Sequence, residues 1–105
     1  MLINGYDVPR AELLTHLIHG RPVLDRIVRE LDLHVVAQTG HMFEPYGYSY
    51  AYVLSESHFT IHTYPEHRSF YMDLFCCSPL FVPSDAVAAV QRAFGGRIHH
   101  QVISR

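Results

Sequence analysis

The chain has 105 residues, a formal net charge of −2 and no lysine, and its eight basic residues are arginines scattered along the sequence. This length supports one core, so we expect a single domain over residues 1–105. The scattered arginines argue against a nucleic-acid or membrane surface, and neither a membrane-spanning apolar run nor a signal peptide is evident.

The cysteines are the adjacent Cys76 and Cys77, which would point to opposite faces of a strand. A disulfide between them is not expected. Free thiols are typical of a reducing compartment, so we expect a cytoplasmic protein.

The first third of the chain predicts two helices. Asp7-Val8-Pro9 resembles a helix start, and apolar residues then recur at helical spacing up to Gly20. Pro22 can begin a second helix, with an apolar stripe that reaches Leu31. Such stripes usually pack into the core.

The rest of the chain is dominated by strand patterns. Ser84 is expected to cap a helix over Asp85–Phe94 that ends at Gly95-Gly96. Short turns between neighbouring runs predict an antiparallel meander. The fold class is therefore α+β: a two-layer sandwich with a mainly antiparallel sheet and helices packed on one face. The expected strands cover residues 33–38, 46–53, 58–64, 70–77 and 97–103.

Four tyrosines alternate along one of these strands, at positions 46, 48, 50 and 52. They would cover one face with large rings whose hydroxyls prefer polar partners. Such a face suits a subunit interface or a ligand cleft. Ordinary aromatic cross-strand packing gives the same pattern.

Residues 55–66 place hydroxyl, imidazole and carboxylate groups in one short segment, with thiols downstream. His58 and His62 do not predict a metal site, because in a strand they lie about 13 Å apart. His99-His100 is expected to be a surface pair. A thiol hydrolase is weakly supported, because no glycine-rich turn that could form an oxyanion hole follows either cysteine.

The missing lysine bears on cofactor chemistry. Pyridoxal phosphate is held as a Schiff base on lysine, so this chain cannot hold it in that way. An arginine-rich genome would also leave lysine out. A protein can still make a carbonyl electron sink from its own backbone, when a serine attacks the preceding peptide carbonyl and the resulting ester eliminates.

Four segments are informative by their order and spacing: Phe43–Ser49, Glu56-Ser57-His58, His62–Glu66 and Asp73–Cys77. Together they cover about half of the chain and resemble the prokaryotic S-adenosylmethionine decarboxylase proenzymes, a pyruvoyl-dependent family. The resemblance implies self-cleavage between Glu56 and Ser57, with Ser57 converted to a pyruvoyl group at the new N-terminus. It implies no pyridoxal phosphate and no metal.

The resemblance also implies roles for single residues. Ser57 is the nucleophile of maturation, the pyruvoyl precursor and the site of the Schiff base. His62 assists ester elimination, and Ser49 supports that step. Cys77 is the proton donor of turnover. The substrate-binding residues are Phe43 and Tyr64, which flank the adenine, and Glu66, which accepts hydrogen bonds from the ribose.

Parity along the chain limits how two of these residues can meet. Ser57 and His62 are an odd number of residues apart, so an unbroken strand would place them on opposite faces. We therefore expect Ser57 in the hairpin turn with Ser55 and Glu56, or a bulge between Ser57 and His62.

Some positions depart from the family pattern. The family usually has Trp at Tyr64, Thr-Cys-Gly at Cys76-Cys77-Ser78, and a small residue at Tyr50, and its opening strand is expected to be missing or shortened. S-Adenosylmethionine is the favoured substrate, and ornithine or arginine is the alternative, each supplying a primary amine. A non-catalytic regulatory relative stays open.

The resemblance implies a catalytic pocket between two protomers, and hence a symmetric homodimer. The tyrosine-rich strand is compatible with such an interface. No nucleic-acid or membrane partner is expected.

Overall fold

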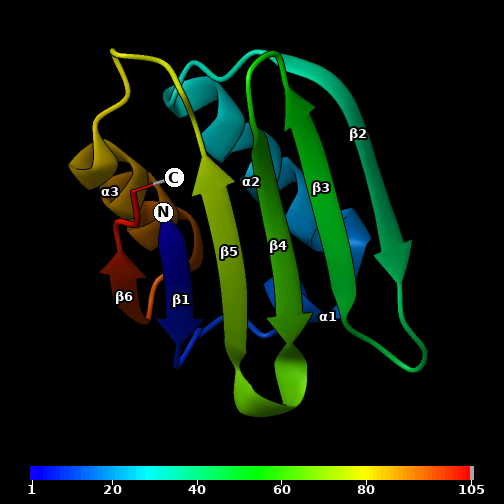
Figure 1. Ribbon diagram of the computed structural model, residues 1–105. Coiled ribbons are helices and arrows are strands. Elements are labelled where there is room, and N and C mark those ends of the chain that lie inside the picture. The colour runs from blue at the N-terminus through cyan, green and yellow to red at the C-terminus, as the bar shows by residue number, and fades with distance from the viewer. Residues whose placement is uncertain (105) are drawn as a thin grey trace.

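The computed structural model describes residues 1–104, which form a six-stranded antiparallel sheet with helices on one face (Figure 1). The predicted two-layer α+β sandwich is confirmed. The strand order is β2-β3-β4-β5-β1-β6. The strands are β1 (Leu2–Tyr6), β2 (Val35–Met42), β3 (Tyr48–Leu54), β4 (His58–Tyr64), β5 (Ser69–Phe75) and β6 (Arg97–Gln101). The helices are α1 (Glu12–Thr15), α2 (Leu17–Glu30), α3 (Pro83–Phe94) and the 3-10 helix η1 (Pro65–His67).

The predicted meander is present as β3, β4 and β5, which pair consecutively. The opening strand, which we expected to be missing or shortened, is a five-residue strand inserted between β5 and β6. Its pattern is hard to read in the sequence, because the two inward positions of β1 are Ile3 and the side-chain-free Gly5. The two strands that come last in the sequence, β5 and β6, thus flank β1 at the start of the chain.

The predicted helix boundaries need correction. The first helix begins at Glu12 rather than at Asp7-Val8-Pro9, and the break between helices falls at His16, which has extended dihedral angles. α2 continues through Gly20 and Pro22. Gly20 is not a helix end, because it lets Tyr48 approach closely: a Cβ there would lie 1.9 Å from the Tyr48 hydroxyl oxygen.

The start of α3 also differs from the prediction. Ser84 makes no capping hydrogen bond, and Val82 occupies the N-cap position. Pro83 provides the start signal instead, because its fixed φ suits the first helical turn, where an N–H would be unpaired.

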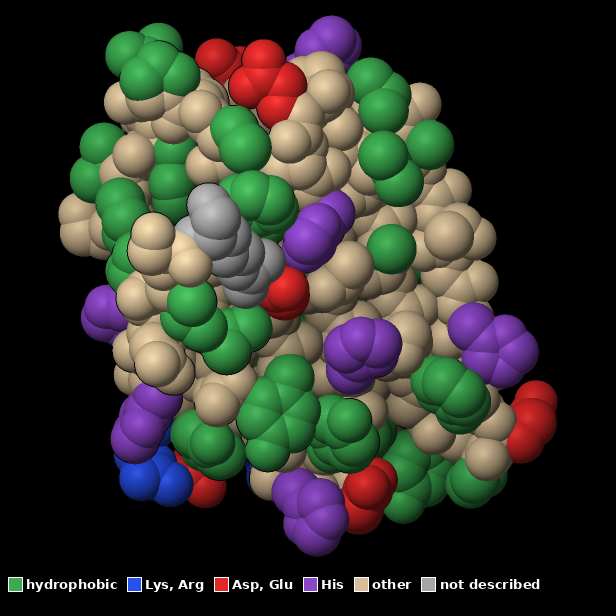
Figure 2. All heavy atoms as spheres, viewed as in Figure 1, with side chains coloured by type: hydrophobic (Ala, Val, Ile, Leu, Met, Phe, Trp, Pro, Cys, Tyr) green, Lys and Arg blue, Asp and Glu red, His purple; other side chains and the backbone are tan. Residues whose placement is uncertain are grey.

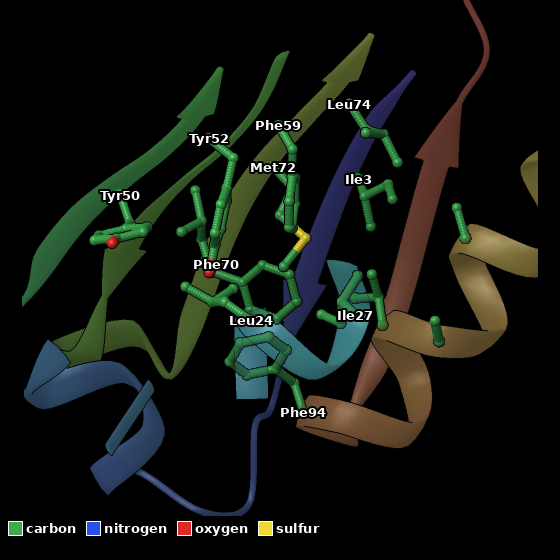
Figure 3. Packing of buried hydrophobic residues seen from close by; sticks show 14 of the residues in the cluster. Ile3, Leu24, Ile27, Tyr50, Tyr52, Phe59, Phe70, Met72, Leu74 and Phe94 are labelled. Atoms are coloured by element: carbon green, nitrogen blue, oxygen red, sulfur yellow. The ribbon is translucent and has the colours of Figure 1, made fainter. Parts of the chain in front are cut away.

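Three of the four tyrosines lie in the core, whereas Tyr46 is 41% exposed. Tyr48, Tyr50 and Tyr52 are at most 5% exposed and point towards the helices, as Figure 3 shows for two of them. The Tyr48 hydroxyl donates to the Leu13 carbonyl at 2.6 Å, and the Tyr52 hydroxyl donates to the Asp25 carboxylate. Burial raises the pKa of both tyrosines, with Asp25 adding to the effect at Tyr52. Aromatic core packing therefore holds for these three tyrosines, while Tyr46 lies at the surface and lines a hollow described below.

The opposite face of the sheet carries the alternate side chains and is the open face of the molecule. Among residues 1–104, no helix covers it (Figure 1). The described helices include none long and apolar enough to cross a membrane. The central strands present to this open face Ser49, Ala51 and Val53 from β3, His58, Thr60, His62 and Tyr64 from β4, and Tyr71, Asp73 and Phe75 from β5.

Candidate active site

A serine and a histidine face each other at the centre of the open face. Ser49 on β3 is the register partner of His62 on β4. The Ser49 hydroxyl and the His62 Nδ1 atom are 2.6 Å apart, within hydrogen-bond distance. Their neighbours on the other side of the sheet, Tyr48 and Thr63, are tied to α1, and Thr63 Oγ1 donates to the Leu14 carbonyl at 2.8 Å. Hydrogen bonds to α1 therefore fix the parts of β3 and β4 that carry Ser49 and His62.

Three other predicted residues gather beside this pair. Phe43, Tyr64 and Glu66 line a hollow of about 270 Å³ that Ser49 and His62 also line, and which we call the nucleoside hollow. Its remaining lining residues are Tyr46, Gly47, Thr63 and Pro65. The five residues predicted for elimination and substrate binding thus share one site.

The β2–β3 loop presents Phe43 to the nucleoside hollow. Gly47 has a φ of +99°, a conformation that favours glycine. The Phe43 N–H donates to the Gly47 carbonyl at 2.8 Å, and the Gly47 N–H donates to the Thr15 carbonyl at 2.8 Å. On the other side of the hollow, the Tyr64 ring packs edge-on against Tyr71, with ring centroids 5.4 Å apart. Two aromatic rings are thus held at the rim.

The predicted cleavage site lies in a turn at the other end of the same strands. β3 ends at Leu54 and β4 begins at His58, so Ser55, Glu56 and Ser57 form the hairpin turn, as parity predicted. The Leu54 N–H donates to the Ser57 carbonyl at 2.8 Å. The turn is exposed at Glu56 and half-buried at Ser57.

A second cavity, of about 340 Å³, lies beneath this turn. Ser57 and Cys76 both line it, together with Glu56 and residues from the ends of α2 and β5. Cys77, the predicted proton donor, is exposed and does not line this cavity. Both cysteines are free.

The predicted residues therefore fall into two groups. Ser57 and the cysteines lie at one end of the sheet, and Ser49, His62 and the nucleoside hollow lie towards the other. His58 and His62 alone are about 13 Å apart along β4, at roughly 3.3 Å per residue, and Ser57 is one residue further away. Ser57, the predicted cleavage residue, and His62, the predicted elimination residue, therefore do not meet within one chain.

Two residues of the open face escaped the sequence analysis as site residues. His58 Nε2 lies 3.2 Å from Asp73 Oδ2 on the neighbouring strand. His41, on β2, is the register partner of Ser49 and packs edge-on against Phe43, with ring centroids 4.7 Å apart. Had β2 been extended to residue 42, its alternation would have placed His41 on this face.

The chemistry available on the open face is that of imidazoles, hydroxyls and aromatic rings. Figure 2 views this face and shows several histidines spread across it, with lysine and arginine colour only at its lower left edge. Across residues 1–104, no three His, Cys, Asp or Glu side chains are grouped to hold a metal ion. The face therefore offers proton transfer and binding of a flat, apolar ring.

Comparison with known proteins supports a family assignment. The sequence profile of a family described as S-adenosylmethionine decarboxylase matches residues 1–105. A solved structure titled as the adenosylmethionine decarboxylase from Aquifex aeolicus VF5 superimposes with a TM-score of 0.77 and 25% sequence identity, covering 99% of this chain and 89% of that one.

Curated bacterial relatives match a little under two thirds of the chain. The S-adenosylmethionine decarboxylase proenzyme of Clostridium botulinum strain Hall is 46% identical over 66 residues, which are 63% of this chain and 57% of that protein. The proenzyme of Acidithiobacillus ferrooxidans ATCC 53993 is 42% identical over 67 residues, or 64% and 50% of the two chains. The match therefore spans about half the length of these curated relatives.

Proposed function

The chain belongs to the S-adenosylmethionine decarboxylase family, and we propose that it is a proenzyme that cuts itself between Glu56 and Ser57 and then decarboxylates S-adenosylmethionine. The product would be the decarboxylated aminopropyl donor used in polyamine synthesis. The observation that carries the proposal is the single site made by Ser49, His62 and the nucleoside hollow. The two free cysteines of the chain, Cys76 and Cys77, are consistent with a cytoplasmic enzyme.

Self-cleavage is supported by the position of Ser57. The Glu56-Ser57 bond lies in the turn beyond the last register pair of β3 and β4, where the Ser57 N–H donates to the Leu54 carbonyl across a long 3.4 Å. The Ser57 hydroxyl is the nucleophile towards the Glu56 carbonyl. An imidazole held like His62, hydrogen-bonded to Ser49, is suited to move the proton from the serine α-carbon during elimination.

The residues present fit a pyruvoyl group made from Ser57. Ser57 is half-buried beside a cavity of about 340 Å³, so a ketone at this position would have room beside it. That group supplies a carbonyl that condenses with the primary amine of the substrate and takes up the electrons of the breaking carbon–carboxylate bond. Cys77 follows the β5 strand, and its thiol is the group proposed to return a proton to the reacting carbon. With no lysine in the chain, pyridoxal phosphate cannot be held in its usual way.

The nucleoside hollow favours S-adenosylmethionine over ornithine or arginine. Phe43 and Tyr64 can flank a purine ring, and Glu66 can accept hydrogen bonds from ribose hydroxyls. A linear diamino acid has no ring to place between aromatic side chains. The observation that favours the nucleoside is thus the aromatic pair with one carboxylate.

The separation of Ser57 from His62 requires a second chain, so we propose a homodimer that pairs open face to open face. A two-fold axis across β4 makes the two β4 strands run in opposite directions. If the axis passes near Thr60, midway between Ser57 and His62, each turn lies over the partner's His62. Each of the two sites would then combine Ser57 and Cys77 of one chain with Ser49 and His62 of the other.

Two measurements test the proposal. Intact-mass analysis of purified protein should find two fragments, with the pyruvoyl terminus on the C-terminal fragment that begins at position 57; an uncut chain would favour a non-catalytic regulatory role. Release of carbon dioxide should then be assayed side by side from S-adenosylmethionine, ornithine and arginine. Faster release from either diamino acid would overturn the substrate assignment and leave the pyruvoyl chemistry standing.

A further inference from the structure

A second hollow on the open face has no role in the site described above. It has a volume of about 270 Å³ and lies next to the nucleoside hollow, since Ser49 and His62 line both. We call it the histidine hollow, because His41 lines it from β2 and His62 lines it from β4. Ser49 and His62 therefore lie between the two hollows.

The side chains beside the two histidines are small. Thr39, Ala51 and Thr60 are register partners across β2, β3 and β4 and form the neighbouring row. His41 is opposite Ser49, and Ser49 is opposite His62, so the three form a row across neighbouring strands. Two strand spacings place the backbones of the histidines about 10 Å apart. This width suits a small polar group that accepts a hydrogen bond from each side.

His41 is held by a residue of the nucleoside hollow. Its ring packs edge-on against Phe43 at 4.7 Å between centroids. A ligand that orders Phe43 therefore also orders His41. Among residues 1–104, Figure 2 shows no lysine or arginine colour over the centre of this face, and the imidazoles of His41 and His62 line the hollow itself.

We propose that His41 binds the α-carboxylate of the substrate. The inference rests on the proposed function, in which the nucleoside fills its hollow and the reacting carbon lies at Ser49 and His62. The reacting carbon also bears the carboxylate, and with one side filled by the nucleoside, the histidine hollow is the open space on the other side. An N–H of the His41 ring donates to a carboxylate oxygen and fixes the bond that will break.

The test separates the two ends of the substrate. Mature protein is reduced with borohydride, which abolishes turnover, and its dissociation constants are measured by calorimetry for S-adenosylmethionine and for 5′-methylthioadenosine, which has no carboxylate. For His41→Ala we expect the dissociation constant of S-adenosylmethionine to rise about tenfold, the loss of one hydrogen bond to a charged group. That of 5′-methylthioadenosine should change less than about twofold.

His99→Ala is the matched control. His99 also packs edge-on against an aromatic ring, that of Tyr6, but it lies on β6, the opposite edge strand. This variant should bind both ligands like the wild type. Equal weakening of both ligands by His41→Ala would mean that His41 only positions Phe43, and unchanged binding would mean no role; each result overturns the inference. If the wild type itself fails to bind S-adenosylmethionine, the proposed function fails first and the inference falls with it.

Discussion

Mixed dimers of two inactive variants provide the sharpest test of a site shared between chains. Ser57→Ala removes the pyruvoyl precursor, and His62→Ala removes the imidazole that assists elimination. Each variant alone should remain uncut and release no carbon dioxide. Ser57 and His62 lie more than about 13 Å apart along one chain, so neither can serve the other in the same protomer.

When the two variants are co-expressed with different affinity tags and the mixed dimer is isolated, one of its two sites regains Ser57 from one chain and His62 from the other. The other site carries both substitutions. We therefore expect about half of the wild-type activity per dimer. Cleavage should be confined to the chain that carries His62→Ala, because only that chain keeps Ser57. Intact mass and carbon dioxide release measure the two effects independently.

Ser57→Ala paired with Cys77→Ala is the control, since both residues come from the same chain in the proposed site. That mixed dimer should stay inactive. If Ser57→Ala and His62→Ala fail to complement while the dimer forms, or if the control pair complements equally well, the shared-site reasoning is refuted.

Four further outcomes follow from the structure. Cys77→Ser should lower kcat by about 10²- to 10⁴-fold while leaving cleavage intact, whereas Cys76→Ser should have the smaller effect; steady-state kinetics with intact mass separates the two. The free energy of unfolding should fall as pH rises above about 10, because the unfolded chain then loses protons that Tyr48 and Tyr52 keep at their raised pKa values; urea titrations at pH 8 to 11 test this. Tyr52→Phe should reduce this loss of stability at high pH. It should also lower the free energy of unfolding at pH 7 by roughly 1–3 kcal/mol, because the Asp25 carboxylate loses the Tyr52 hydroxyl as a donor; an unchanged free energy of unfolding would contradict this expectation. Gly20→Ala should destabilise by about 1–3 kcal/mol in the same titrations, because its Cβ would overlap the Tyr48 hydroxyl.

The fold was predictable where periodicity and turns agree. Alternation over residues 58–64 and the short turns around it predicted the meander and the turn position of Ser57. The prediction failed where tertiary contacts decide: Gly20 fits under Tyr48 rather than ending a helix, and Gly5 hides the inward pattern of β1.

The site was predictable in its parts but not in its arrangement. The family resemblance named Ser49, His62, Phe43, Tyr64 and Glu66, and the structure places all five around one hollow, while their roles stay a prediction. Which face the tyrosines occupy depends on the packing of α1 and α2 against the sheet, which the strand pattern does not encode. His41 was missed because β2 runs four residues beyond the predicted strand.

The strand order has a consequence for a chain that is cut after Glu56. The N-terminal piece contributes β1, β2 and β3, and the C-terminal piece contributes β4, β5 and β6, yet the order across the sheet is β2-β3-β4-β5-β1-β6. The two pieces are interleaved in the sheet. The β4–β5 hairpin of the C-terminal piece lies between β3 and β1 of the N-terminal piece, and β1 lies between β5 and β6 of the C-terminal piece. Neither can leave without breaking three ladders at once, so severing the backbone yields a two-chain protein that holds together with no covalent link.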